Sequence, residues 1–354
     1  MSIVVIGPGA IGLLCAIRLA RAGQVVTLLA RPATAAQLAG QPLILHYGDQ
    51  PVQTTAVTIA DDPAALAEQP SALALVCVKG YDTEGVIPAL QTLQPAHILT
   101  LQNGIGNEEM LAAHFGNERV ISGAITTSVE IDAPGQISVA KAGGVGLAPM
   151  APTTSVHQWA NVLSAAGFRV QTYADYRAMK WSKVLLNMLG NATAAILDMS
   201  VEAVYADHRL VALEQRAFLE ALHTMQRLGC RPVNLPRYPA AILARAMQYL
   251  PAPLLYPALR RVIASGRGGK PPSLLLDLQG GNSRSEGAFL YGAVADTAAQ
   301  VGVPAPVNHV LWDTLKAIAR GEVPWDTFRH QPDALLMAVQ RSARTTQPAK
   351  RGMS

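Results

Sequence analysis

The stretch IVVIGPGAIG (residues 3–12) places Gly7, Gly9 and Gly12 in a G-x-G-x-x-G array. The array follows a short apolar run typical of a strand buried on both faces, and it opens a segment with helical periodicity. In such an array the first glycine permits a tight turn, the second lets the backbone approach a pyrophosphate, and the third lets helix and strand pack closely, with the anion at the helix N-terminus. We therefore predict a dinucleotide-binding turn, rather than an ordinary glycine-rich turn, at Gly7, Gly9, Ala10, Ile11 and Gly12.

The end of the second predicted strand, VVTLLA (25–30), favours one type of dinucleotide. Enzymes that use NAD usually carry Asp or Glu here, which accepts a hydrogen bond from the ribose 2′-hydroxyl. This chain carries Ala30 and then Arg31. A guanidinium suits a 2′-phosphate because it donates charge-assisted hydrogen bonds. We predict NADP (NADPH) as the cofactor, with Arg31 on the 2′-phosphate; the alternative is that Arg31 only begins a surface loop.

Strands and helices alternate through the first half of the chain. This order predicts an α/β Rossmann-type fold with a doubly wound parallel sheet and right-handed connections. Residues 43–59 predict a hairpin that turns at Gly48-Asp49, and residues 135–149 predict two further strands. The other expected strands are 3–7, 25–30, 72–79, 97–104, 119–126 and 168–173, and the expected helices between them are 10–23, 83–93, 105–115 and 154–166.

Strand patterns end near residue 175, and helical patterns replace them. We therefore predict that an all-helical C-terminal domain follows the sheet. Residues 1–174 would form the NADP-binding Rossmann domain and 175–340 the substrate-binding and catalytic domain, while the polar, basic tail 341–354 would be disordered. The expected helices are 177–199, 207–228, 238–249, 284–301 and 306–319, with a Gly/Pro-rich loop at 265–273.

Composition excludes several classes of protein. The 354 residues are 50% hydrophobic and 15% charged, with a formal charge of +4 and no basic stripe interleaved with aromatic residues, so we expect no nucleic-acid partner. Three widely spaced cysteines favour neither a disulfide framework nor a metal site. With neither a signal peptide nor a membrane-spanning run in the sequence, we expect a cytoplasmic protein without a membrane partner. Apolar helices in the second domain would permit a homodimer.

The second informative stretch is KWSKVLLNMLGN (residues 180–191). Lys183, Asn187 and Asn191 recur at intervals of four, so on one continuous helix they lie along one stripe. Apolar residues surround this stripe, and asparagine is a poor helix former. We interpret the stripe as an active-site face; the alternative is a solvated helix face. Lys180 is about 60° away from the stripe at helical geometry, and we predict that it is solvated.

Two loops follow strands at the carboxyl edge of the predicted sheet, where ligands of such sheets bind. One is VKGYD with Lys79, and the other is LQNG with Gln102, Asn103 and Gly104. Each could be an ordinary turn, since Asn-Gly is a common turn pair. Their shared edge favours a role in binding.

These motifs, in this order, resemble those of the ketopantoate reductase family, over nearly the whole chain to about residue 320. The landmarks are GPGAIG, VKGYD, LQNG, KWSKVLLNMLGN, and PPSLLLDL…RSE together with GVPAPVN. The resemblance implies an NADPH-binding Rossmann domain, an all-helical second domain, and an active site in the cleft between them. It implies a catalytic role for Lys183 and Glu286, substrate binding by Asn187, Asn191 and Ser273, and cofactor-side roles for Lys79 and Asn103.

The chain departs from the family pattern at three places. One additional residue separates Asp277 from Glu286, Tyr291-Gly292 stands where Asn-Gly is frequent, and Lys270 stands where a substrate-binding asparagine is expected. These departures bear on the choice of substrate more than on the reaction.

The chemistry explains the residue types. When a hydride reaches the carbon of a 2-oxo acid, charge grows on the carbonyl oxygen, and a lysine ammonium can both polarise that oxygen and protonate it. Neutral Asn187 and Asn191 could hold substrate oxygens, Ser273 could donate to the carboxylate, and Glu286 could accept from a substrate hydroxyl or hold the lysine. Three hypotheses follow: an NADPH-dependent ketopantoate reductase that makes pantoate for pantothenate and coenzyme A synthesis, a sibling reductase of another branched 2-oxo acid, and a non-catalytic NADP-binding sensor.

Overall fold

The computed structural model describes residues 1–48, 50–68, 70–264 and 271–345. The chain divides into two compact units. The first holds Met1–Lys180 and a return segment, Val233–Pro239; the second holds Trp181–Pro232 and the residues from Ala240 onward. Asp49 of the predicted hairpin turn, most of the predicted loop 265–273 with Lys270, and the tail from residue 346 lie outside the described residues.

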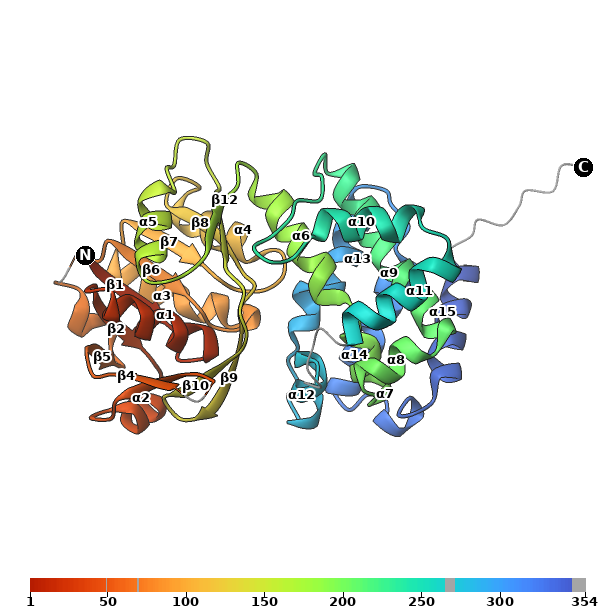
Figure 1. Cartoon of the computed structure of the whole chain (residues 1–354), viewed down its shortest axis with the longest axis horizontal. Helices are drawn as coiled ribbons and strands as arrows, with labels where there is room; N and C mark the ends of the chain where they lie inside the picture. Colours follow the sequence, from red (N-terminus) through yellow and green to blue (C-terminus); the bar gives the residue numbers. More distant parts are fainter. Residues whose placement is uncertain (49, 69, 265–270, 346–354) are drawn as a thin grey trace, which may run out of the picture. The chain divides into compact units, whose positions relative to one another are not determined.

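The first unit is built on an eight-stranded sheet (Figure 1) with the order β12-β11-β8-β7-β6-β1-β2-β5. Each neighbouring pair is parallel except β8 and β11, which are antiparallel. The predicted α/β Rossmann-type fold is therefore confirmed, with one antiparallel pair near an edge. The strands are β1 (Ser2–Ile6), β2 (Val25–Leu29), β5 (Val57–Ala60), β6 (Leu73–Val76), β7 (His97–Thr100), β8 (Val120–Ile125), β11 (Val145–Pro149) and β12 (Val170–Thr172).

Strand β1 shows why the sheet is covered on both faces. Ile3 and Val5 lie in one apolar core, whereas Val4 and Ile6 lie in another, as alternating side chains must. The first core also includes residues of helices α1 (Ala10–Arg21) and α5 (His157–Ala165). The second includes residues of α3 (Thr83–Leu93) and α4 (Asn107–Phe115). A continuous apolar run such as SIVVI is thus explained by burial on both sides.

A smaller sheet, which the sequence did not predict as a unit, has the order β4-β3-β10-β9. The hairpin predicted at 43–59 is confirmed in β3 (Leu43–Tyr47) and β4 (Gln50–Thr54), but its last residues belong to β5, which pairs with β2 in the large sheet. The two strands expected at 135–149 exist, but β10 (Gln136–Lys141) belongs to this sheet and β11 to the large one. Strand β9 (Ser128–Ala133) was missed, because its residues are mostly half-buried or exposed and give little apolar signal.

The second unit is helical. Its helices, the first of which begins in the first unit, are α6 (Tyr176–Met188), α7 (Ala192–Leu197), α8 (Val201–Ala206), α9 (His208–Arg227), α10 (Ala240–Tyr249), α11 (Ala252–Leu259), α12 (Ser273–Gln279), α13 (Tyr291–Gln300), α14 (Pro306–Ala319) and α15 (Pro332–Thr345). Short turns of other helix types lie between them: a π turn at Arg260–Ala264, η4 (Glu286–Phe289) and η5 (Trp325–Thr327). No helix among the described residues is both long enough and apolar enough to span a membrane.

Two predictions for the second unit were wrong. The helix expected at 177–199 is interrupted between α6 and α7, with Gly190 at φ +61°. The sequence analysis also missed α15, which includes residues 341–345 of the tail that was predicted to be disordered. Leu335 and Val339, one turn apart, are buried and pack this helix onto the unit, so a short apolar stripe was enough to order it.

Candidate functional site

The glycine turn has the geometry that a dinucleotide pyrophosphate requires. Gly7 has φ +103°, a left-handed conformation that favours glycine, and its N–H donates to the Leu29 carbonyl at 3.1 Å. A Cβ on Gly12 would lie 1.9 Å from the Gly7 carbonyl oxygen, so only glycine allows this helix–strand contact. At Gly9 a Cβ would have no described atom within 4 Å, and no described side chain caps the N-terminus of α1. The residues present therefore fit a dinucleotide with its anion on this helix terminus.

The end of β2 presents Arg31 to solvent. Arg31 precedes α2 (Pro32–Leu38), its side chain is 78% exposed, and its guanidinium lies 3.4 Å from the Asp82 carboxylate. Asp82 belongs to the VKGYD loop, in the short helix η2 (Gly80–Asp82). An exposed pair of this kind is weak, so a 2′-phosphate can compete with Asp82 for Arg31.

Buried Gln102 joins the two predicted loops. Its Nε2 donates to the carbonyl oxygens of Val78 and Lys79 at 3.1 and 3.3 Å and to the Thr83 hydroxyl at 2.8 Å. The loops after β6 and β7 are thus held together, as their shared edge predicted. Lys79 and Asn103 are exposed beside this buried amide. The hydrogen bonds of the Gln102 side chain fix the backbone of both loops and so position Lys79 and Asn103.

Lys180 occupies a buried site beneath the same loops, and the prediction that it is solvated was wrong. Lys180 is 2% exposed, and its Nζ lies 2.9 Å from the Glu108 carboxylate and donates to the Gln102 carbonyl at 2.6 Å. The Ser122 hydroxyl donates to the same carboxylate at 2.8 Å. A buried ammonium requires such partners. The prediction used only the angle of about 60° between Lys180 and the Lys183 stripe on a helix. It failed because protein also covers the side of α6 on which Lys180 lies.

In the second unit, Lys183 and Asn187 lie one turn apart on α6, and both are half-buried. The predicted continuous stripe ends there, because α6 stops at Met188 and Gly190 turns the backbone through a left-handed conformation. Asn191 is buried at the N-cap position of α7 instead of lying two turns on along the same helix. Lys183 and Asn187 therefore keep the predicted geometry, and Asn191 reaches the same region by a different route.

Two residues that the sequence analysis missed hold this turn. The Tyr291 hydroxyl donates to the Met188 carbonyl at 2.5 Å and accepts from the Ala192 N–H at 3.0 Å. The buried Glu214 carboxylate accepts from the Gly190 N–H at 2.6 Å and from the Thr193 hydroxyl. These bonds satisfy backbone groups that the broken helix would otherwise leave unpaired. The one sequence signal was Tyr291 itself, noted as a departure from the family pattern.

Asn191 connects the turn to another predicted residue. Its Nδ2 donates to the Asn187 carbonyl at 3.0 Å, and its Oδ1 accepts from the Leu274 N–H at 3.3 Å. Leu274 follows Ser273, the exposed first residue of α12. The structure thus brings Asn187, Asn191 and the start of α12 together. Glu286 lies on a separate segment, at the start of η4, and is 7% exposed.

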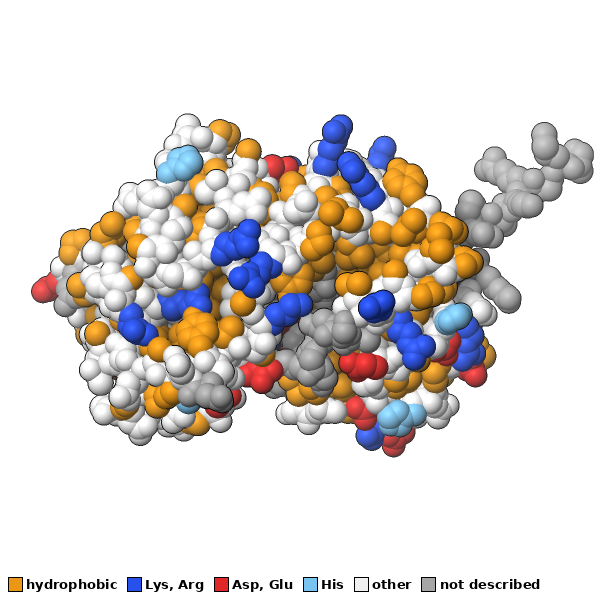
Figure 2. Space-filling model, viewed as in Figure 1, with side chains coloured by type: hydrophobic (Ala, Val, Ile, Leu, Met, Phe, Trp, Pro, Cys, Tyr) orange, Lys and Arg blue, Asp and Glu red, His pale blue; other side chains and the backbone are white. Residues whose placement is uncertain are grey.

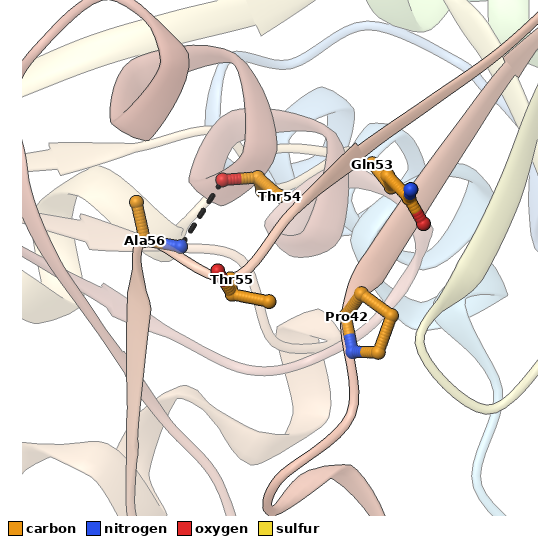
Figure 3. A pocket seen from close by; sticks show the side chains of 5 residues that line it. All are labelled: Pro42, Gln53, Thr54, Thr55 and Ala56. Atoms are coloured by element: carbon orange, nitrogen blue, oxygen red, sulfur yellow. Dashed lines mark hydrogen bonds between the residues drawn. The ribbon is translucent and has the colours of Figure 1, made fainter.

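A hollow of about 520 Å³ lies elsewhere in the first unit (Figure 3). Pro42, Gln53, Thr54, Thr55 and Ala56 line it, and the Thr54 hydroxyl accepts from the Ala56 N–H at 3.1 Å. Pro42 directly precedes β3, and residues 53–56 run from the end of β4 to the residue before β5. None of them lies at the carboxyl end of a strand of the large sheet, where ligands of doubly wound sheets bind. Among the described residues its lining has no charged side chain, and we do not place the dinucleotide or the substrate there.

Comparison with known proteins gives the same family for both parts of the chain. Residues 3–152 match the family described as ketopantoate reductase PanE/ApbA, and residues 175–319 match its C-terminal part. A 2-dehydropantoate 2-reductase of Halobacterium salinarum is 30% identical over 324 residues, which cover 90% of this chain and 99% of the relative.

Solved structures give the same result. A PanE/ApbA family ketopantoate reductase from Ralstonia eutropha superposes with a TM-score of 0.75 at 26% identity, covering 91% of this chain and 99% of that one. A D-mandelate dehydrogenase, solved with NADH and anilino(oxo)acetate, has a TM-score of 0.76 at 18% identity and covers 91% of this chain and 99% of its own. At that identity the second likeness concerns the fold alone.

Proposed function

This chain belongs to the ketopantoate reductase PanE/ApbA family, and we propose that it reduces ketopantoate to pantoate with NADPH. Pantoate made in this way would serve pantothenate and coenzyme A synthesis. The observation that supports the proposal most is the pair of half-buried polar side chains, Lys183 and Asn187, one turn apart on α6. The substrate would be a small anionic 2-oxo acid.

The glycine turn and the loops of the first unit would hold the cofactor. Gly9 and the N-terminus of α1 would bind the pyrophosphate, with Arg31 on the 2′-phosphate and Lys79 and Asn103 further along the same edge. When bound, the reduced nicotinamide supplies the hydride. Gln102 would keep both loops in place, because it belongs to the loop after β7 and its side chain donates to the backbone of the loop after β6.

Lys183 would act as the general acid. Its ammonium would polarise the ketone oxygen and give it a proton as negative charge develops there, and solvent would then reprotonate the amine. Asn187 would hold substrate oxygens without adding a charge that competes with the lysine. Asn191 would act mainly by positioning, because both ends of its amide are bonded to backbone. Ser273 could donate to the substrate carboxylate, and Glu286 could accept from a substrate hydroxyl.

The test compares the rates of ketopantoate reduction with NADPH and with NADH. The loss of reduced-nicotinamide absorbance measures each rate. We expect a higher kcat/KM with NADPH. Arg31→Ala should lower kcat/KM for NADPH by about ten- to a hundredfold, the worth of one charge-assisted hydrogen bond, and leave NADH nearly unaffected. Equal loss with both cofactors would contradict a role for Arg31 on the 2′-phosphate.

The second candidate is a sibling reductase of another branched or bulky 2-oxo acid. The departures at Tyr291 and Lys270 favour it, and the D-mandelate dehydrogenase neighbour has a name in keeping with a bulkier acid. A panel of 2-oxo acids separates the two candidates: turnover of another acid without turnover of ketopantoate would select the sibling. Binding of NADPH without reduction of any acid would instead select the sensor hypothesis.

A further inference from the structure

The first unit carries a second, smaller hollow with an unusual lining. Its volume is about 140 Å³, and three arginines, Arg18, Arg169 and Arg237, contribute to its wall. They come from three segments far apart in sequence: α1, the residue before β12, and the return segment Val233–Pro239. Figure 2 shows Lys and Arg side chains gathered on the viewed face of this unit.

Arg18 is held in place by aromatic rings. Its guanidinium lies 4.5 Å from the ring centre of Phe168 and 5.3 Å from that of Tyr47, and it donates to the Gly167 carbonyl at 3.3 Å. Burial lowers the pKa of the Arg18 guanidinium from its usual range. These contacts orient the planar donor fork before any ligand arrives, which reduces the entropy lost on binding.

Arg237 is fixed by its backbone. It has φ +62°, uncommon for a residue with a side chain, inside a tight turn closed by two 2.8 Å hydrogen bonds between Leu235 and Tyr238. The return segment is anchored to the first unit, because the Thr126 hydroxyl donates to the Pro236 carbonyl at 2.9 Å and the Tyr173 hydroxyl donates to the Asn234 carbonyl at 2.7 Å. Non-glycine residues in this conformation are frequent at binding sites.

Within the described residues, no carboxylate pairs with any of the three arginines, and no acidic side chain lines the hollow. Three cations around one concavity repel each other, so an anion placed among them gains attraction and relieves that repulsion. The guanidinium fork matches phosphate oxygens in pairs. A volume of 140 Å³ is below the roughly 300–1,000 Å³ of pockets that enclose drug-sized ligands, so the hollow suits one anionic group.

We propose that this arginine hollow, formed by Arg18, Arg169 and Arg237, binds a phosphate group. It differs from the glycine turn, because Arg18 lies in the last turn of α1, nine residues from Gly9 and therefore about 13 Å along the helix axis. A bound phosphate would join α1, the start of β12 and the return segment. The group could come from free phosphate or from a phosphate monoester whose remainder stays in solvent.

The experiment measures phosphate affinity by isothermal titration calorimetry at constant ionic strength, with chloride as the balancing anion. Two variants remove exposed pocket arginines: Arg169→Ala, and Arg237→Gly, which also suits the left-handed backbone. We expect each to weaken binding about ten- to a hundredfold, since each removes a charge-assisted hydrogen bond to the phosphate. Arg21→Ala, an exposed arginine on the same helix outside the hollow, should leave the affinity unchanged.

Two further arms separate the alternatives. Inorganic phosphate and phenyl phosphate are compared: equal affinities identify the phosphate group as the recognised element, and tighter binding of phenyl phosphate identifies a monoester. Binding that survives Arg169→Ala and Arg237→Gly but is lost in Arg31→Ala would place phosphate beside Arg31, at the end of β2, and overturn the proposal. Heat that chloride alone reproduces at the same ionic strength would also overturn it.

Discussion

Two lysines three residues apart on α6 have opposite environments. Lys180 is almost completely buried, with its ammonium on the Glu108 carboxylate and the Gln102 carbonyl. Lys183 is half-buried and has a neutral amide, Asn187, one turn further along. A lysine fixed on a buried carboxylate holds structure, whereas a half-buried lysine keeps the solvent access that a general acid needs to exchange its proton. Residue type and spacing alone do not distinguish these roles, but the surroundings do.

The largest expected effect is on catalysis at Lys183. Lys183→Met should lower kcat by about 10²- to 10⁴-fold, because general acid–base catalysis typically contributes that much. Binding of NADPH, measured by the quenching of protein fluorescence, should survive. Lys183→Arg is the informative companion, since arginine keeps the charge but cannot give up its proton near neutral pH. Recovery of activity in Lys183→Arg would mean that charge, and not proton donation, is the main contribution.

Lys180 should show the opposite behaviour, with its largest effect on stability. Lys180→Met leaves Glu108 buried without its cation and removes a donor from the Gln102 carbonyl, so we expect a loss of about 3–5 kcal/mol in the free energy of unfolding. Urea denaturation measures it. The double variant Lys180→Met/Glu108→Leu should recover much of the loss, since replacing a whole buried pair by apolar groups is often neutral. An unfolding midpoint in urea equal to that of wild type would show that the Lys180–Glu108 pair does not stabilise the fold.

The turn that carries Asn191 gives a smaller effect. Tyr291→Phe leaves the Met188 carbonyl and the Ala192 N–H without the hydroxyl that bridges them, which should cost about 1–3 kcal/mol. Tyr249→Phe is a matched control in the same unit, because Tyr249 is 74% exposed, and it should change stability by less than about 0.5 kcal/mol. Equal stability of the two variants would show that the bridge is dispensable.

The sequence predicted those parts of the molecule that local pattern determines. The apolar run of β1, the glycine array and the alternation of strands with helices were sufficient for the α/β sheet, because buried strands and glycine turns have local signals. The break after Met188 was missed, although Gly190 was visible, because what stabilises it is Tyr291 and Glu214, distant in the chain. Strand β9 and helix α15 were missed because their apolar signals are weak.

The same reasoning explains the error at Lys180. Helical geometry gives the angle between two side chains on one helix but not what packs against each side. The partners of Lys180 come from α4 and from the loop after β7, more than seventy residues earlier. Long-range partners of this kind leave no trace in the local pattern, and a buried charge pair is therefore the hardest part of such a site to predict.

His97 extends the comparison to a partly buried base, and it gives the smallest expected effect. Its ring lies 5.7 Å from the Trp159 ring, and among the described residues its Nδ1 has no hydrogen-bond partner. Burial, and then the charge of Arg119, lower the pKa of His97 from its usual value. As pH falls, the unfolded chain binds the proton before the folded chain does. The contribution of neutral His97 to stability should therefore be complete above about pH 6.5 and decrease as pH falls from there through the lowered pKa. Comparison of thermal unfolding at neutral and acidic pH should show a smaller decrease in His97→Phe than in wild type, with exposed His157→Phe as the control. Parallel decreases in all three proteins would mean that His97 is already solvated enough to titrate normally.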